Sequence, residues 1–191
     1  MRFFVLLFIL LMTACQSTGN GSAETVNMYN KSADLIGTAK LSEESDGVHV
    51  KLKLEGLKPG LHGIHVHEMP VCKGEDFKSA GSHYNPEGKE HGLMNPEGAH
   101  LGDMPNIKAD DDGLVDSEVL ISDATLKDGK KSLLKGGGTS LVVHEKQDDG
   151  ASQPSGKSGV RIACGEIKTD SQTKEKEPTD PTDFNDKQQE N

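Results

Sequence analysis

The chain has 191 residues, a formal net charge of −10, 22 glycines and no tryptophan. The negative charge argues against nucleic-acid binding, which calls for a basic surface. No apolar run approaches the roughly 20 residues of a membrane-spanning helix. Aromatic residues make up only 4% of the chain, and together with the many glycines this favours a β-rich domain with long loops over a helical bundle.

Residues 1–14 have the character of an export signal. Arg2 precedes an apolar run, 3–12, and small residues follow it, which is the order of a secretory signal. The segment Met12-Thr-Ala-Cys15 resembles the lipobox of bacterial lipoproteins, in which the cysteine is lipidated and becomes the mature N-terminus. We therefore expect an exported lipoprotein of the cell envelope, attached to the membrane only through lipid on Cys15. The alternative is a plain signal peptide with an incidental cysteine.

A small, polar stretch comes next, and residues 15–23 are expected to form a flexible tether. Alternating apolar segments then predict eight strands, at 24–29, 34–41, 47–55, 61–68, 103–109, 114–121, 139–144 and 160–168. Short strands with unequal loops predict an all-β domain over 24–167, an eight-stranded antiparallel Greek-key barrel or sandwich with two long functional loops. The charged segment 168–191 lacks the apolar residues of a core and is expected to be a disordered tail.

The third predicted strand has the clearest alternation, because Val48, Val50, Leu52 and Leu54 fall on one face. His49 falls on the other face, among lysines, and is expected to be solvated.

His65 and His67 lie two residues apart on the fourth predicted strand, so both side chains leave the same face, while Ile64 and Val66 point to the core. Two imidazoles at this spacing can hold a metal ion, although half-exposed polar positions would have the same pattern. His62 has the opposite parity and is expected either to be packed in the domain or to support the ligands from outside the site, rather than to bind metal.

The apolar periodicity disappears between about residues 70 and 102. A structureless loop of this length is unusual in a compact domain unless it is functional. His83, His91, His100 and Asp103 can organise it, since three histidines and one carboxylate match a tetrahedral zinc site. The remaining imidazoles suit copper.

If Cys15 carries lipid, it cannot form a disulfide, and the exported chain then has one pair of cysteines, Cys72 and Cys164. A bridge between them would close a loop of about ninety residues and stabilise the domain by roughly 4–5 kcal/mol in the chain-entropy model. The alternative is two free, buried thiols.

Six motifs occur in an order that resembles copper/zinc superoxide dismutase of the bacterial exported type, and they cover roughly residues 24–167. They are Gly63-Ile-His-Val-His-Glu68, Gly81-Ser-His-Tyr-Asn-Pro86, Glu90-His-Gly92, Gly98-Ala-His-Leu-Gly-Asp-Met-Pro-Asn106, Leu141-Val-Val-His-Glu145 and Gly159-Val-Arg-Ile-Ala-Cys-Gly165.

The resemblance implies a role for each matching residue. It implies copper ligands at His65, His67, His83 and His144, and zinc ligands at His83, His91, His100 and Asp103, so that His83 bridges the two metals. Asp148 matches a carboxylate that links a copper histidine to a zinc histidine. Arg161 matches the arginine beside the copper channel, which docks the anionic substrate and is anchored by the Cys72–Cys164 disulfide.

The function implied is the conversion of superoxide to dioxygen and hydrogen peroxide, which protects the cell exterior from oxidative damage. The expected partner is the superoxide anion, and His83 and Arg161 are the expected catalytic residues. Subunit packing does not transfer with the resemblance, so a homodimer and a monomer both stay open. The alternative function is a noncatalytic lipoprotein that binds zinc or buffers copper.

Overall fold

The computed structural model describes residues 23–168. The expected signal and most of the tether, together with nearly all of the expected tail, lie outside the described residues. Within 23–168, no helix has both the length and the apolar character needed to cross a membrane.

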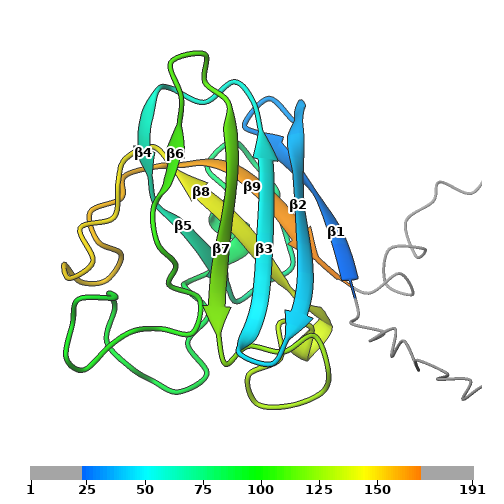
Figure 1. The fold of residues 1–191 in the computed structure, drawn as a ribbon, viewed down its shortest axis with the longest axis vertical. Coiled ribbons are helices and arrows are strands. Elements are labelled where there is room, and N and C mark those ends of the chain that lie inside the picture. The colour runs from blue at the N-terminus through cyan, green and yellow to red at the C-terminus, as the bar shows by residue number, and fades with distance from the viewer. Residues whose placement is uncertain (1–22, 169–191) are drawn as a thin grey trace, which may run out of the picture.

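Antiparallel strands make up almost all of the regular structure (Figure 1). They are β1 (Ala23–Asn30), β2 (Leu35–Glu44), β3 (Gly47–Leu54), β4 (Gly60–His62), β5 (Ile64–His67), β6 (Ile107–Ala109), β7 (Val115–Ser122), β8 (Thr139–His144) and β9 (Arg161–Ile167). Two short 3-10 helices, η1 (Lys78–Ala80) and η2 (Lys135–Gly137), lie in the connections.

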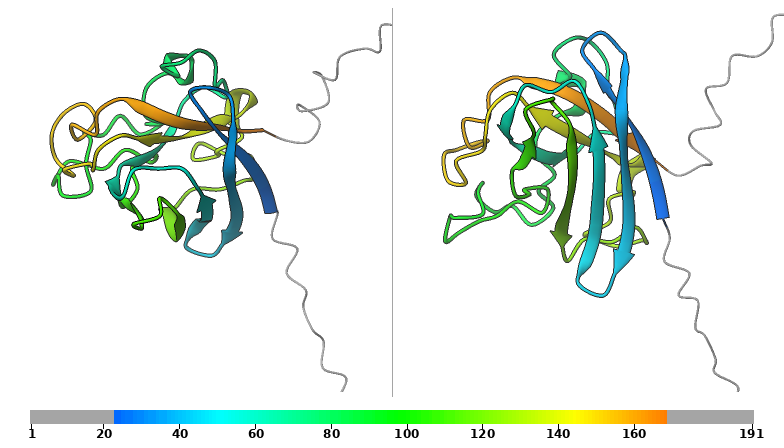
Figure 2. Two further views of the ribbon diagram at one scale, coloured as in Figure 1. Left: turned by 90° about the horizontal axis from the view of Figure 1, so that it is seen from above. Right: turned by 45° about the horizontal axis from the view of Figure 1, so that its top comes forward.

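Seven of these strands form one sheet in the order β5-β8-β9-β1-β2-β3-β7, and β4 pairs with β6. The sheet curls on itself, so that β5, β8 and β9 pack behind β1, β2, β3 and β7, with β6 beside β7 (Figure 1). The later part of the loop 68–106 and the loop 145–160 extend from the barrel on the same side (Figure 2). This confirms the predicted all-β antiparallel barrel.

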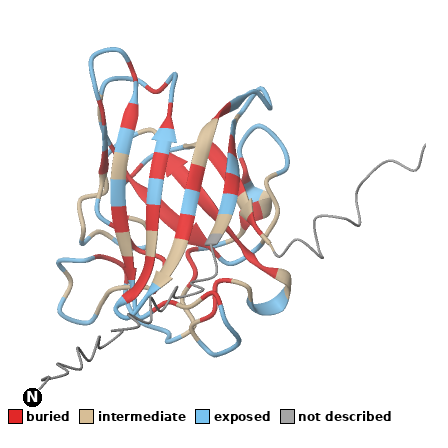
Figure 3. Ribbon diagram, turned by 45° about the vertical axis from the view of Figure 1, so that its right-hand side comes forward, coloured by how far each residue is buried: buried red, intermediate tan, exposed pale blue. Residues whose placement is uncertain are grey.

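Buried and more exposed residues alternate along β3, as the alternation of apolar and polar residues in the sequence predicted (Figure 3). Val48, Val50, Leu52 and Leu54 are buried in the core, with Ile64 and Val66 of β5 in the same cluster. Each fully buried aliphatic side chain of this kind stabilises the fold by about 1.5–3 kcal/mol. The barrel is therefore a rigid support for the loops.

The predicted strand 61–68 is wrong in one respect, because it is broken into β4 and β5 at Gly63. The Gly63 amide donates to the Lys146 carbonyl, and the Gly63 carbonyl accepts from the His144 amide, both at 2.8 Å. A β-carbon at this position would approach the Ser158 β-carbon to 3.0 Å. The chain thus changes partner at a glycine, from β6 to β8.

The predicted strand 103–109 is also too long, since only Ile107–Ala109 pairs as a strand. Asp103 forms an isolated bridge to His65 instead, and Pro105 has no amide hydrogen to give to a ladder. Residues 103–106 therefore belong to the long loop.

Candidate metal centre

The free edge of β5 organises the long loop 68–106. The Tyr84 amide donates to the Val66 carbonyl and the Val66 amide donates to the Gly102 carbonyl, both at 2.8 Å. A β-carbon on Gly102 would come within 2.4 Å of the Val66 oxygen, so this close approach requires glycine. Backbone pairing along β5 thus places His83 opposite His67, and Asp103 opposite His65.

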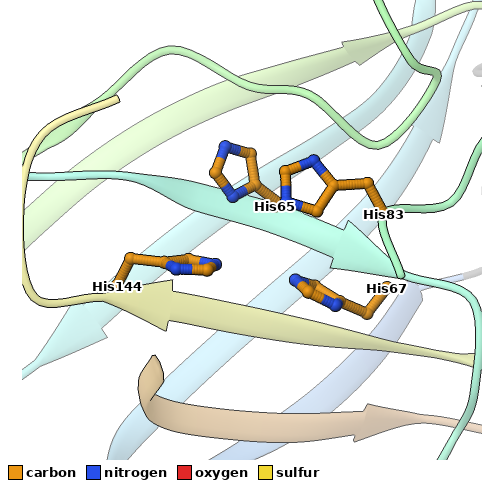
Figure 4. Close-up of side chains that lie close together, drawn as sticks. All are labelled: His65, His67, His83 and His144. Carbon is orange, nitrogen blue, oxygen red and sulfur yellow. The ribbon is translucent and has the colours of Figure 1, made fainter. Parts of the chain in front are cut away.

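Four histidines converge where β5, β8 and the loop meet. The structure brings together His65, His67, His83 and His144, each with a ligand nitrogen within 4.8 Å of the others (Figure 4). The rings of His65 and His83 stack with centroids 4.0 Å apart, and the His144 ring meets His65 edge-on at 4.9 Å. All four side chains are buried.

Each of these rings uses one nitrogen for a hydrogen bond and leaves the other without one among residues 23–168. The nitrogens left over are His65 Nδ1, His67 Nε2, His83 Nε2 and His144 Nε2. A buried nitrogen without a partner costs about 1–3 kcal/mol, and four of them in one place meet the requirements of a metal ion. An all-imidazole set suits copper.

The second group shares His83 with the first. Asp103 lies at its centre, with one carboxylate oxygen 2.9 Å from His83 Nδ1 and 3.3 Å from His100 Nδ1. Its other oxygen lies 3.0 Å from His91 Nδ1. Nδ1 of His91 and of His100 has no aligned hydrogen bond within the described part of the chain, although both nitrogens face the carboxylate. Three imidazoles and one carboxylate match a closed zinc site.

Burial and neighbouring charge prepare both groups for cations. Burial, with the nearby imidazoles, lowers the pKa of His67 to about 2, of His144 to about 3 and of His83 to about 4, so these rings are neutral at pH 7. Burial would raise the pKa of Asp103, but the close approach of His83, His91 and His100 to its carboxylate outweighs burial and, with a hydrogen bond from the Gly92 amide, lowers that pKa well below its usual range. Neutral imidazoles and an ionised carboxylate are the forms that bind metal.

Asp148 ties the two groups together from behind. One of its oxygens accepts from His65 Nε2 at 2.6 Å, and both oxygens lie within 3.2 Å of His91 Nε2. These bonds leave the Nδ1 atoms of His65 and His91 turned toward the two candidate metal positions. Asp148 and Asp103 together outweigh the effect of burial and raise the pKa of His91 to about 9.

The sequence matches the copper/zinc superoxide dismutase family over residues 35–167. The chain belongs to this family. It is 51% identical to superoxide dismutase [Cu-Zn] 2 of Aquifex aeolicus over 143 residues, 74% of this chain and 84% of that protein. It is 44% identical to superoxide dismutase [Cu-Zn] of Caulobacter vibrioides over 135 residues, 69% of this chain and 78% of that protein. Copper and zinc are therefore its cofactors, and the donors described above fit both ions.

Solved structures that resemble this chain include a superoxide dismutase and a dismutase-like protein. The Cu/Zn superoxide dismutase from Brucella abortus matches with a TM-score of 0.63 at 36% identity, over 77% of this chain and all of that chain. A superoxide dismutase-like protein from Bacillus subtilis matches with a TM-score of 0.74 at 35% identity, over 76% of this chain and 99% of that chain. One of these relatives is called only dismutase-like. The case for dismutase activity in this chain therefore depends on its own metal-binding residues.

The predicted disulfide is present in this family member, joining Cys72 to Cys164 across 92 residues. Arg161 lies three residues before Cys164 and donates to the Phe77 carbonyl at 2.6 Å and the Gly81 carbonyl at 2.7 Å. The Gly81 carbonyl also accepts from His67 Nδ1 at 2.9 Å. The loop that the disulfide anchors thus holds both Arg161 and His67 through the Gly81 carbonyl oxygen.

His62 is packed, as predicted, but its contacts were not foreseen. Its two ring nitrogens each lie 2.8 Å from a backbone carbonyl, one of His144 and the other of Lys58. His62 therefore holds the backbone of His144 in place. The position of His62 on the opposite face of the predicted strand indicated that it is buried. It did not indicate that the carbonyls of His144 and Lys58 are its partners.

Two further histidine contacts depend on tertiary structure. The Ser158 hydroxyl lies 3.1 Å from His144 Nδ1, which sequence reasoning missed because Ser158 belongs to no recognisable motif. His49 lies on the polar face as expected, yet the surrounding lysines are not its partners. Its ring contacts Asp46 at 3.0 Å and Glu118 at 3.3 Å, and hydrogen bonds to these carboxylates raise its pKa.

Proposed function

We propose that this protein protects the outside of the cell by converting superoxide to dioxygen and hydrogen peroxide at a copper ion joined through His83 to a zinc ion. The observation that carries the proposal is the arrangement of His83. Its Nε2 faces three other imidazoles, and its Nδ1 faces the carboxylate of the second group. A ring placed in this way can serve both metals at once.

In the proposed assignment, copper is held by His65, His67, His83 and His144. Zinc is held by His83, His91, His100 and Asp103. When bound, copper supplies the one-electron redox chemistry that this reaction requires.

The protein residues then have three tasks. Two superoxide anions and two protons give one dioxygen and one hydrogen peroxide, so one anion loses the electron that the other gains. Arg161 is the permanent cation beside the copper group, and its half-buried guanidinium positions the anion. His83 Nε2 carries a proton toward the anion that gains the electron, and solvent supplies the second. Asp148 and Gly81 keep the histidines in their binding orientations.

The test is the rate of superoxide decay, measured by stopped-flow absorbance with the copper- and zinc-loaded protein. We expect decay far faster than in buffer containing the same free metals. His144→Ala should abolish activity but leave zinc bound, because His144 belongs only to the copper group. His49→Ala, at a partly exposed histidine outside both groups, is the matched control and should leave the rate unchanged.

Two results would contradict the proposal. A loaded protein with no more activity than the free metals would favour a noncatalytic metal-binding protein. Equal loss of zinc and copper from the His144→Ala protein would refute the division of ligands.

We also propose that the mature protein begins at a lipidated Cys15 and lies on the outer face of the membrane. Arg2, the apolar run 3–12 and the lipobox-like segment support this assignment. Mass spectrometry of the membrane fraction should detect diacylglyceryl-modified Cys15, and Cys15→Ser should abolish both the modification and the membrane association. An unmodified cysteine in the mature protein would refute lipidation.

A further inference from the structure

A cleft of about 400 Å³ opens beside the zinc group, His83, His91, His100 and Asp103, two of which line it. Glu87, Lys89 and Leu93 of the long loop form one wall, and Leu120, Ser122 and Asp123 at the end of β7 form the other. His100 and Asp103 lie between the walls. We call this space the zinc-side cleft.

The zinc group approaches solvent at this cleft. The side chain of His100 is 12% exposed, whereas those of His91 and Asp103 are 0% and 1% exposed. His91 is covered by Asp148, and His83 faces the copper group. A zinc ion held by these residues therefore has its shortest way to solvent past His100.

One side chain joins the two walls. Lys131 Nζ lies 3.4 Å from a carboxylate oxygen of Glu87 and 3.3 Å from one of Asp123. The side chains of Lys131 and Glu87 are 30% and 26% exposed, whereas that of Asp123 is 75% exposed. The ion pair with Glu87 is therefore less screened by solvent than the ion pair with Asp123.

A second contact fastens the same loop to the same connection. Tyr84 follows His83 in the sequence, and its hydroxyl donates to the Ser132 carbonyl at 2.8 Å. The segment after β7 thus holds the loop at two points, the partly exposed Lys131 and the Ser132 carbonyl that accepts from the buried Tyr84.

We propose that the zinc-side cleft is the path by which zinc enters and leaves, and that Lys131 keeps it closed by joining Glu87 to Asp123. The proposal rests on the assignment of zinc to His83, His91, His100 and Asp103. The walls belong to separate segments, so the loop can move away from β7 without disturbing the barrel ladder. Lys131 also places a positive charge at the mouth, which disfavours passage of a cation.

The test is the rate at which the copper- and zinc-loaded protein releases zinc to the chromogenic chelator 4-(2-pyridylazo)resorcinol. Lys131→Met should accelerate release about fivefold, a modest effect because both ion pairs of Lys131 are reached by solvent. Lys131→Arg keeps the charge and should retain slow release. Lys127→Met is the matched control, because Lys127 belongs to the same connection but pairs with Glu43 at 2.9 Å, outside the cleft.

Asp123→Asn separates closure from simple electrostatics. If Lys131 closes the cleft, Asp123→Asn and Lys131→Met both accelerate release, and the double variant is no faster than Lys131→Met because both changes break one contact. If charge alone controls release, the two variants shift the rate in opposite directions, and the proposal is wrong. Unchanged release from Lys131→Met, or equal acceleration in Lys127→Met, also overturns it.

Zinc content before release distinguishes this inference from the proposed function. A protein that binds no zinc at the four ligands refutes the ligand assignment itself. A protein that binds zinc normally, with release unaffected by Lys131→Met, refutes only the role of the cleft.

Discussion

Replacement of Asp148 by asparagine tests how the two metal positions are coupled. In the native protein, the carboxylate accepts from His65 Nε2 at 2.6 Å and from His91 Nε2 at 3.2 Å. Its pKa lies well below the usual range, because hydrogen bonds from the two histidines and from the Gly150 amide outweigh the effect of burial. The side chain is thus an anion that fixes two imidazoles at once.

An asparagine side chain has nearly the same shape but only one accepting oxygen. Its amide group would direct a donor at one of the two ring N–H groups, so one histidine loses its partner and turns. Loss of such an outer carboxylate typically weakens metal binding by about 10-fold to 100-fold, or about 1.4–2.7 kcal/mol. We expect this loss for both metals, because His65 belongs to one group and His91 to the other.

The assay is copper and zinc content after dialysis against a graded series of chelator concentrations. Asp149→Asn is the matched control, because Asp149 accepts from the Ser152 hydroxyl at 2.6 Å and from the Ala151 amide rather than from a metal-group histidine. Native retention of both metals by Asp148→Asn would refute the coupling. Equal losses in the Asp149→Asn protein would attribute the effect to the loop as a whole.

Three further predictions concern the arginine, the disulfide and the histidines. Arg161→Gln should lower the superoxide rate constant about tenfold and flatten its dependence on ionic strength, because it removes the cation beside the copper group; an unchanged salt profile would contradict this role. Reduction of Cys72–Cys164 should lower the free energy of unfolding by about 2–5 kcal/mol and loosen the loop that holds Arg161, which thermal unfolding with and without reductant will measure. A midpoint independent of reductant would contradict that estimate. In the metal-free protein, the lowered pKa of His67, His83 and His144 means that the unfolded chain binds protons first as pH falls below 6.5. Stability should therefore decrease on acidification from pH 6.5 toward pH 4, whereas the raised pKa of His91 gives stability that is lost as pH rises toward 9. Urea midpoints between pH 4.5 and 9 will check both slopes, and a flat profile would contradict them.

The strands and the chemistry of the donors are written into local sequence. Val48, Val50, Leu52 and Leu54 alternate because a strand has a period of two, and this pattern is readable without a structure. The same period of two predicted that the side chains of His65 and His67 lie on one face of their strand. The choice of three imidazoles and one carboxylate predicted zinc because ligand type selects the metal.

The convergence of these donors depends on contacts distant in sequence. His144 lies 79 residues after His65, and no local pattern says that β8 pairs with β5. The break at Gly63 was not predicted as a boundary, since it depends on the approach of Lys146 and Ser158 from another loop. The roles of the ligands came from resemblance to a family rather than from periodicity.

The sequence by itself thus determined the alternating strands, the histidines available as metal ligands, and the two cysteines, Cys72 and Cys164, available for a disulfide within the domain. Tertiary structure decided which nitrogens meet, because the loop 68–106 is ordered by the edge of β5, by Asp148, and by Lys131 and Ser132 from the segment after β7. Periodicity describes how an element buries its own faces. It carries no information on which distant hydroxyl, carboxylate or ammonium will hold a loop without periodicity in place.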